Sequence, residues 1–151
     1  MSVRALSLVL LLATGQIHAA SCSLSTTPVS FGDYNPLTVL PRDASGTLTV
    51  SCTSGLLEIV NLNIALSAGA SGYSSARHMT QAANTLNYNL YQDITRLVLW
   101  GSGANSQSSN LNITTILLPF NVNFTVYGRI PAQQNVAGGS YSDTITATLT
   151  F

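Results

Sequence analysis

The stretch Phe120-Asn-Val-Asn-Phe-Thr-Val126 alternates strictly between large apolar and short polar side chains. Successive side chains of an extended strand point to opposite faces, so this spacing gathers the apolar side chains on one face. Interleaved asparagine and threonine make a poor helix, whereas β-branched residues suit a pleated surface. The stretch therefore predicts a β-strand that is buried on one face only.

The same two-residue period recurs along the rest of the chain. It covers residues 47–52, 60–66, 86–90 and 144–151. Turn-forming residues separate these runs at positions 35–36, 44–46, 67–72, 101–110 and 138–139. Many short strands without an apolar period of helical length predict an all-β protein with a β-sandwich. Because no repeat or linker interrupts the pattern, we expect a single domain.

The first 20 residues read as a secretory signal peptide. Residues 1–4 carry one arginine, residues 5–14 form an apolar run, and Ala19 and Ala20 supply the small residues of a cleavage site. The run is shorter than the roughly 20 apolar residues that span a bilayer. We expect cleavage after residue 19 or 20, a folded domain over residues 21–151, and no membrane insertion.

Charge is scarce in the exported part. Arg4 leaves with the leader, so four arginines oppose five carboxylates, the net charge is near −1, and lysine is absent. Nucleic-acid binding needs clustered basic residues, which argues against that class of partner. Weak repulsion between copies favours association. An assembly protein is the interpretation that this composition favours, and a neutral monomer is the alternative.

Cys22 and Cys52 are the two cysteines of the chain, and both lie in the exported part. Two cysteines in an oxidising compartment most simply form a disulfide. The rival interpretation is a lipoprotein acylated at Cys22. The preceding residues 19–21 lack the usual leucine, and lipidation would leave Cys52 without a partner.

Residues for catalysis are sparse. The exported part holds one histidine, His78, and no Gly-x-Ser-x-Gly motif, so we expect a solvated loop histidine and no hydrolytic triad. Carboxylates such as Asp33 and Asp143 could form a glycosidase pair, but nothing in their spacing singles them out. Clustered metal ligands are also lacking. The sequence therefore predicts no enzyme activity, no cofactor and no metal site.

Four apolar residues lie at or beside expected loops and are candidates for surface contacts. Trp100 ends an apolar run just before the polar loop 101–110, where it either packs in the core or anchors a partner. The other three candidates are Leu56, Leu57 and Tyr73.

Several blocks, taken in order, resemble the domains of the spore coat protein U family, which include subunits of archaic chaperone–usher pili. The blocks are Cys22-Ser-Leu-Ser-Thr-Thr-Pro-Val-Ser-Phe-Gly-Asp-Tyr34, Gly46-Thr-Leu-Thr-Val-Ser-Cys52, Leu86-Asn-Tyr-Asn-Leu-Tyr-Gln-Asp93, Trp100-Gly101, Val126-Tyr-Gly-Arg-Ile-Pro131 and Gly139-Ser-Tyr-Ser-Asp-Thr144. Together they cover essentially the whole exported part.

The resemblance implies an immunoglobulin-like β-sandwich that lacks its last strand. In such pili a periplasmic chaperone fills the open edge, and after export through an outer-membrane usher a neighbouring subunit replaces it by strand addition. The resemblance also implies a place on the cell surface and a role in attachment and biofilm formation. We expect the accepting edge at the end of the chain, at Thr144, Ile145, Ala147, Leu149 and Phe151.

One departure from the pattern concerns the donor strand. Fibre-building members carry a donor segment before the first cysteine, whereas here only Ser21, with Ala20 if cleavage follows Ala19, precedes Cys22. We therefore expect a tip or capping subunit that accepts a strand without donating one. The alternatives are a spore or cell coat structural protein and a secreted carbohydrate-binding or hydrolase-like β-sandwich.

Overall fold

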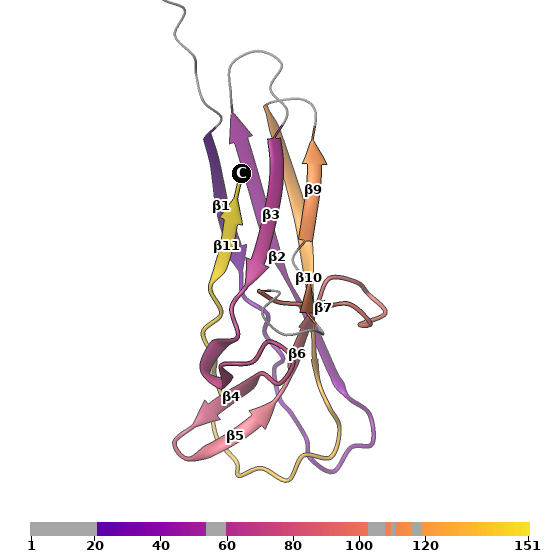
Figure 1. Cartoon of the computed structure of the whole chain (residues 1–151). Helices are drawn as coiled ribbons and strands as arrows, with labels where there is room; N and C mark the ends of the chain where they lie inside the picture. The colour runs from indigo at the N-terminus through magenta and orange to yellow at the C-terminus, as the bar shows by residue number, and fades with distance from the viewer. Residues whose placement is uncertain (1–20, 54–59, 103–107, 110, 116–118) are drawn as a thin grey trace, which may run out of the picture.

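A computed structural model of the chain describes residues 21–53, 60–102, 108–109, 111–115 and 119–151 (Figure 1). The described part is almost entirely strands and connecting loops, with one short 3₁₀ turn. Its elements are β1 (Ser21–Thr27), β2 (Arg42–Thr53), β3 (Val60–Leu66), η1 (Gly69–Ser71), β4 (His78–Gln81), β5 (Asn84–Asn87), β6 (Asn89–Tyr91), β7 (Leu99–Trp100), β8 (Ser108–Ser109), β9 (Leu111–Thr115), β10 (Phe120–Ile130) and β11 (Ala147–Thr150).

The strands form two main sheets and a hairpin. One sheet has six strands in the order β1-β2-β10-β6-β7-β8, and the other has three in the order β11-β3-β9. The hairpin pairs β4 with β5. In Figure 1 the smaller sheet stands in front of β1, β2 and β10, which gives the two layers of the predicted β-sandwich.

The stretch that opens the sequence analysis lies in β10, at the centre of the larger sheet. Phe120, Val122 and Phe124 stand opposite Cys52, Val50 and Leu48 of the antiparallel β2. The apolar members of both strands are the more buried ones, and the intervening polar residues of β10 are exposed. The alternation thus produces an inward apolar face, as predicted.

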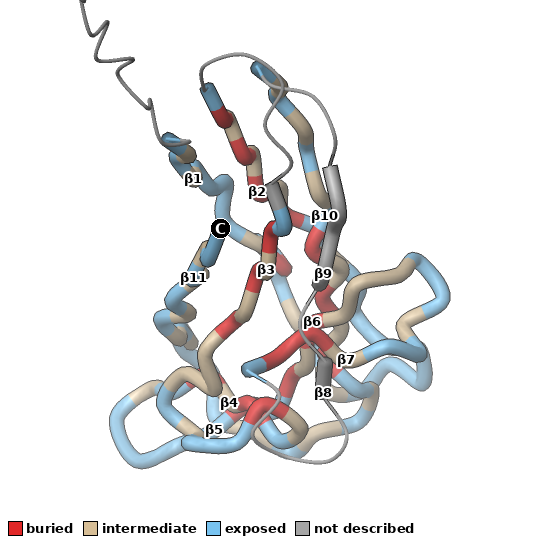
Figure 2. Tube along the Cα trace, turned by 45° about the horizontal axis from the view of Figure 1, so that its top comes forward, coloured by how far each residue is buried: buried red, intermediate tan, exposed pale blue. Residues whose placement is uncertain are grey.

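Burial is uneven across the sandwich (Figure 2). Val50 of β2 and Ile64 of β3 are completely buried. The apolar residues of β1, of β11 and of the first half of β10 are only half-buried, although they pack against the same core. The core is therefore covered less well beneath the strands that start and end the described chain.

Trp100 belongs to the core. Its side chain is 1% exposed, and the indole Nε1–H donates a 2.9 Å hydrogen bond to the carbonyl oxygen of Ile64. This bond joins β7 of the larger sheet to β3 of the smaller one. The possible role of Trp100 as a surface contact is therefore wrong, because pairing of β7 with β6 turns its ring inward.

Four local expectations differ from the structure. The expected turn at residues 44–46 lies within β2, because these residues pair with β10. The closing strand covers Ala147–Thr150 instead of residues 144–151, because residues 142–146 are held by separate hydrogen bonds. His78 is half-buried at the start of β4 and does not lie in a loop. Within the expected loop 101–110, Ser108–Ser109 pairs in parallel with β7, since backbone pairing needs no particular side chains.

Candidate binding cleft between two sheet edges

The sandwich is open along one seam. β1 is an edge strand of the larger sheet and pairs with β2, and β11 is an edge strand of the smaller sheet and pairs with β3. The two strands stand near each other in Figure 1, but in the described chain no ladder joins them. Each therefore presents one side to the seam that carries no neighbouring strand.

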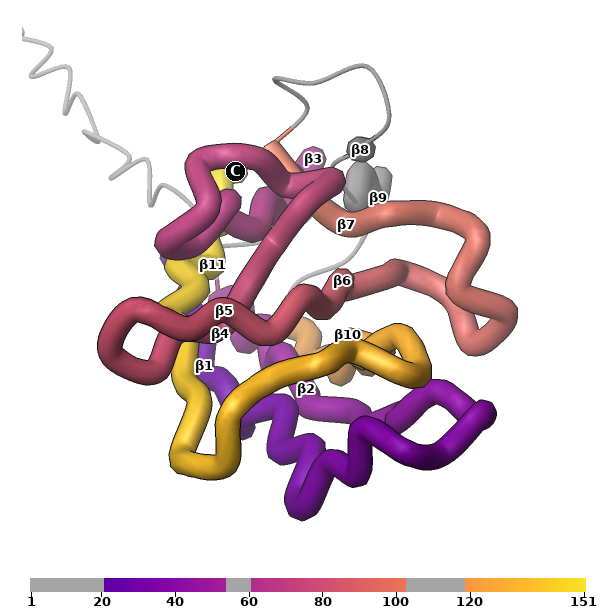
Figure 3. Tube along the Cα trace, turned by 90° about the horizontal axis from the view of Figure 1, so that it is seen from below, coloured from indigo at the N-terminus to yellow at the C-terminus, as the bar shows by residue number. Residues whose placement is uncertain are grey.

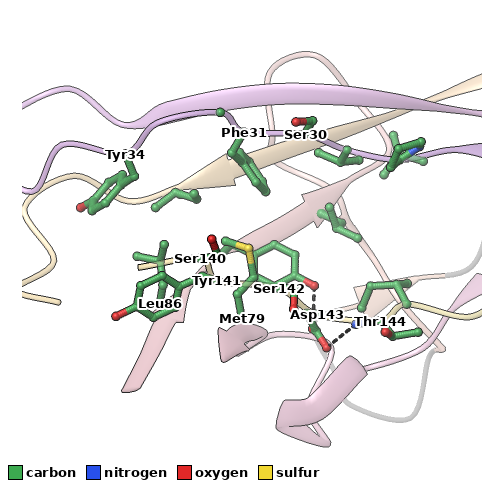
Figure 4. A pocket seen from close by; sticks show the side chains of 18 of the residues that line it. Ser30, Phe31, Tyr34, Met79, Leu86, Ser140, Tyr141, Ser142, Asp143 and Thr144 are labelled. Atoms are coloured by element: carbon green, nitrogen blue, oxygen red, sulfur yellow. Dashed lines mark hydrogen bonds between the residues drawn. The ribbon is translucent and has the colours of Figure 1, made fainter. Parts of the chain in front are cut away.

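An open cleft of about 980 Å³ runs along this region. Residues 26–34, which continue from β1, form one wall, and residues 136–145, which lead to β11, form much of the other. The core supplies the floor, which consists of Leu48, Leu66, Met79, Leu86, Tyr88, Leu90, Val126 and Ile130. Figure 4 shows Phe31 and Tyr34 on one side of the cleft, with Met79 and Tyr141 across from them.

The backbone groups of β11 alternate between its partner strand and its open side. Ser67 N–H donates to the carbonyl oxygen of Thr146 at 2.9 Å, and Thr146 N–H donates to Ser67 Oγ at 2.9 Å. Backbone groups of an antiparallel strand alternate in direction. Because Thr146 faces β3, the amides and carbonyls of Ala147 and Leu149 point away from β3 toward the open side.

The side chains of the expected edge residues alternate as well. Ile145, Ala147 and Leu149 are half-buried and pack on the core, whereas Thr144 is exposed. Phe151, which follows β11, is 53% exposed. The structure thus turns Ala147 and Leu149 of the open strand β11, and Ile145 just before it, toward the core.

Two glycines of the larger sheet let the other wall of the cleft, residues 26–34, cross the inner face of that sheet. A Cβ on Gly128 would lie 2.7 Å from the ring of Phe31 and 2.8 Å from a methyl group of Val29. A Cβ on Gly46 would lie 2.7 Å from the carbonyl oxygen of Thr27. Phe31 is thereby seated deep enough to make an edge-to-face contact with Tyr88, with ring centroids 5.9 Å apart. This aromatic pair lies at the cleft.

Asp143 joins the wall formed by residues 136–145, here called the β11 wall, to the floor of the cleft. One carboxylate oxygen accepts hydrogen bonds from Ala70 N–H at 2.9 Å and Thr144 N–H at 2.8 Å. The other accepts the Tyr88 hydroxyl at 2.7 Å. Burial and this hydrogen bond both raise the pKa of Tyr88, so its phenol stays protonated and acts as a donor.

The other edge is tied down by a disulfide. Cys22 of β1 is bonded to Cys52 of β2, directly opposite in the strand register. The disulfide expected from the sequence is thus present, and Cys22 retains no thiol for acylation. It fixes the outer end of β1 to the sheet.

Of the candidates for catalysis, Asp33 and Asp143 both line the cleft, whereas His78 does not. Asp143 is committed to the three hydrogen bonds above, Asp33 is exposed, and His78 begins a hairpin. In the described chain no three His, Cys, Asp or Glu side chains are grouped to hold a metal ion. No described helix is long and apolar enough to cross a membrane.

The remaining contact candidates fall in two classes. Tyr73 is 60% exposed and available at the surface. Leu56 and Leu57 lie outside the described residues.

Two exposed apolar loops were missed by the sequence reasoning. The loop before β2 exposes Leu37, Val39 and Leu40, and the loop between β6 and β7 exposes Ile94 and Leu97. Both project on the side away from β1 and β11 (Figure 3). Short apolar runs between turn residues are the signal that could have located them, but periodicity alone does not tell such runs from strands.

Polar contacts fix both loops at their bases. Asp43 accepts a bidentate pair of hydrogen bonds from Arg129 at 2.7 and 2.8 Å. It also lies 3.3 Å from the guanidinium of Arg96, which ties the two loops together. Within the second loop, Asp93 accepts bonds from Thr95 Oγ1 and Val98 N–H, which lower the pKa of its carboxyl to about 2.

Comparison with known proteins places these features in a family context. The sequence matches the Spore Coat Protein U domain family over residues 8–148. It is 37% identical to Protein U of Myxococcus xanthus over 132 residues. The aligned region covers 82% of this chain and 71% of that protein.

A solved structure shares the fold. It is a chain in the crystal structure of the CsuC-CsuE chaperone–tip adhesion subunit pre-assembly complex from the archaic chaperone–usher Csu pili of Acinetobacter baumannii. The TM-score is 0.58 at 20% identity, over 88% of this chain and 40% of the other. The present chain thus spans less than half of that relative. The match confirms the expected fold class, an immunoglobulin-like β-sandwich.

Proposed function

This chain belongs to the Spore Coat Protein U domain family, and on that premise we propose that it is a non-catalytic subunit of a surface pilus assembled by the chaperone–usher route. The observation that carries the proposal is the open seam between β1 and β11, with its apolar cleft. An edge with unpaired backbone groups beside an apolar floor is the arrangement that accepts an added strand.

The proposed partners follow from this chemistry. A periplasmic chaperone first supplies an extended segment whose backbone pairs with Ala147 and Leu149 and whose alternate side chains enter the cleft. A neighbouring subunit replaces that segment at an outer-membrane usher. The half-buried Ile145 and Ala147, which line the cleft, then become better covered, which stabilises the subunit through loss of exposed apolar surface.

A terminal position in the fibre is the finer part of the proposal. From Ser21 to Thr27 the chain is paired with β2, and Cys22 is covalently held there. These residues cannot extend into another subunit without giving up β1. A donor strand would therefore have to come from before Ser21, where the sequence predicts the signal peptide.

Attachment and biofilm formation complete the proposal, and the two apolar loops support them. Leu37 and Leu97 are 86% and 82% exposed. Local hydrogen bonds order both loops, since Asn35 Oδ1 accepts Leu37 N–H at 2.9 Å and Asp93 Oδ1 accepts Val98 N–H at 2.8 Å. Ordered apolar side chains far from the seam could contact a surface while the cleft is filled. Biofilm formation by a Leu37→Ser/Leu97→Ser variant should fall while its level in the pilus is unchanged.

A second candidate is a coat structural protein assembled through the same edge. The description of the family and the 37% identity to Protein U favour it. Gold-labelled antibody on intact cells distinguishes the possibilities: labelled single fibre ends fit a capping subunit, labelling along the shaft contradicts the terminal position, and a uniform layer without fibres indicates the coat.

Co-expression with a periplasmic chaperone from the same gene neighbourhood tests the main proposal. Leu149→Asp places a charge on the inner face of the accepting edge, where an unpaired charge costs several kcal/mol. Thr148→Asp, on the exposed face of the same strand, is the matched control. We expect the chaperone to co-purify with the wild type and the control but not with Leu149→Asp. Equal recovery of all three would contradict strand addition at β11.

A further inference from the structure

We propose that Asp143 is a positioning residue that holds the β11 wall of the cleft in its strand-accepting place before any partner arrives. The inference rests on the proposed function, because it assigns the wall a role in receiving a strand. Its first test needs no partner.

Among the described residues, the backbone hydrogen bonds that hold the β11 wall lie on its outer side. Thr80 and Ser142 exchange backbone hydrogen bonds of 2.9 and 3.2 Å, and Ser67 and Thr146 exchange the two bonds described above. The opposite side of the segment faces the cleft. A segment with bonds on one side would lose order easily unless its position were fixed by something other than a neighbouring strand.

Asp143 supplies that fixation at the centre of the segment. Its carboxylate collects donors from three places: Ala70 N–H in η1, the Tyr88 hydroxyl in the core, and Thr144 N–H in the wall itself. Tyr88 is only 5% exposed. Hydrogen bonds to an ionised acceptor are stronger than neutral ones, so one side chain ties the wall to two rigid elements.

A buried cation supports the same arrangement. Arg77 is fully buried and donates to the carbonyl oxygens of Ser67 at 3.0 and 2.6 Å and of Ser74 at 3.1 Å. Burial lowers the pKa of Arg77, and the negative charge of Asp143 opposes that shift. Ser67 in turn bonds to Thr146, which lies between the wall and β11. Arg77, through Ser67, and Asp143 thus hold the chain at two neighbouring places, Thr146 and Asp143 itself.

The backbone at Gly69 leaves room for the carboxylate of Asp143. Gly69 has a φ of +66°, and a Cβ at this position would lie 2.1 Å from an oxygen of Asp143. Gly72, in the same turn with a φ of +74°, has nothing within 4 Å of its Cβ position. Space is therefore reserved at Gly69 for the carboxylate, which a merely exposed aspartate would not require.

The functional consequence is preorganisation. Ordering a flexible segment during association reduces affinity, so a wall that is already in place binds a strand more tightly. Asp143 accordingly acts on binding through the wall and does not contact the partner's reacting or pairing atoms.

Hydrogen exchange on the isolated exported chain tests the idea, with Asp143→Asn as the main variant and Tyr88→Phe as a second variant that removes a single donor. Asp33→Asn is the matched control, since it removes the same charge from an exposed position on the cleft rim. We expect Asp143→Asn to speed exchange in residues 141–149 roughly tenfold and to leave residues 120–130 unchanged. The control should alter neither segment.

Unchanged exchange in residues 141–149 of both variants, or a uniform rise over the whole chain, would overturn the proposal. The complex with the co-expressed chaperone gives the second readout. There an added strand holds the wall, so the difference between Asp143→Asn and wild type should vanish, whereas a purely structural defect would persist. Failure of any complex to form would count against strand addition, while the result on the isolated chain would still decide the role of Asp143.

Discussion

Removal of the Cys22–Cys52 disulfide offers a quantitative test of how the cleft is built. The bond closes a loop with a sequence separation of 30 residues. In the chain-entropy treatment, such a loop stabilises the folded state by about 3.6 kcal/mol at 25 °C. An unfolding entropy of about 2.1 cal/mol/K per residue, applied to residues 21–151, converts this into a fall in Tm of about 13 °C.

The effect should concentrate at the open seam. β1 pairs with one strand only, and its side chains are mostly exposed, so little apolar burial remains to hold it once the bond is gone. We therefore expect β1 to separate from β2 before the rest of the sandwich unfolds. The far side of the sandwich, joined through Trp100, should be affected less.

Urea and thermal unfolding of a Cys22→Ala/Cys52→Ala variant measure the loss, and the wild type with reductant serves as the control for the alanine side chains. Exchange in residues 21–27 reports on β1 itself. A loss below about 1 kcal/mol, without faster exchange in β1, would refute the reasoning that the bond secures this edge.

Three further outcomes follow from single contacts. The pKa of Asp93 is about 2, so the stabilisation of its loop is complete above the ordinary carboxyl pKa and is lost as the pH falls through about 2; carbon NMR titration of the carboxyl checks this, and a midpoint near 4 would contradict it. Gly69→Ala should lower Tm more than Gly72→Ala, because both have positive φ but only the former meets Asp143, and equal melting temperatures would count against that contact. Trp100→Phe should cost about 1–3 kcal/mol in denaturant unfolding by leaving a buried carbonyl of β3 unpaired, and an unchanged midpoint would show the bond to be dispensable.

The fold class could be predicted from the sequence because a strand that is buried on one face alternates apolar and polar residues. The apolar members of Phe120–Val126 line one face of β10, and the cysteines stand opposite each other in adjacent strands. The accepting edge is a hypothesis from the resemblance to a known family, and the structure places Ala147 and Leu149 on an edge strand.

Other features depend on contacts between residues far apart in the chain. Asp143 and Tyr88 are separated by 55 positions, and no local sequence pattern predicts their hydrogen bond. The burial of Arg77 contradicts the usual exposure of arginine and is understandable only once the carbonyls around it are known. The inward turn of Trp100 likewise depends on β7 pairing with β6.

The central claim is that a partner adds a strand to the open side of β11. Residue-resolved amide exchange, recorded on the isolated chain and on its complex with the co-expressed chaperone, tests this most directly. The account predicts strong new protection at Ala147 and Leu149, whose amides face the seam, and little change at Thr146 and Thr148, which face β3. Equal protection of all four amides, or protection confined to the loops that carry Leu37 and Leu97, would contradict the claim.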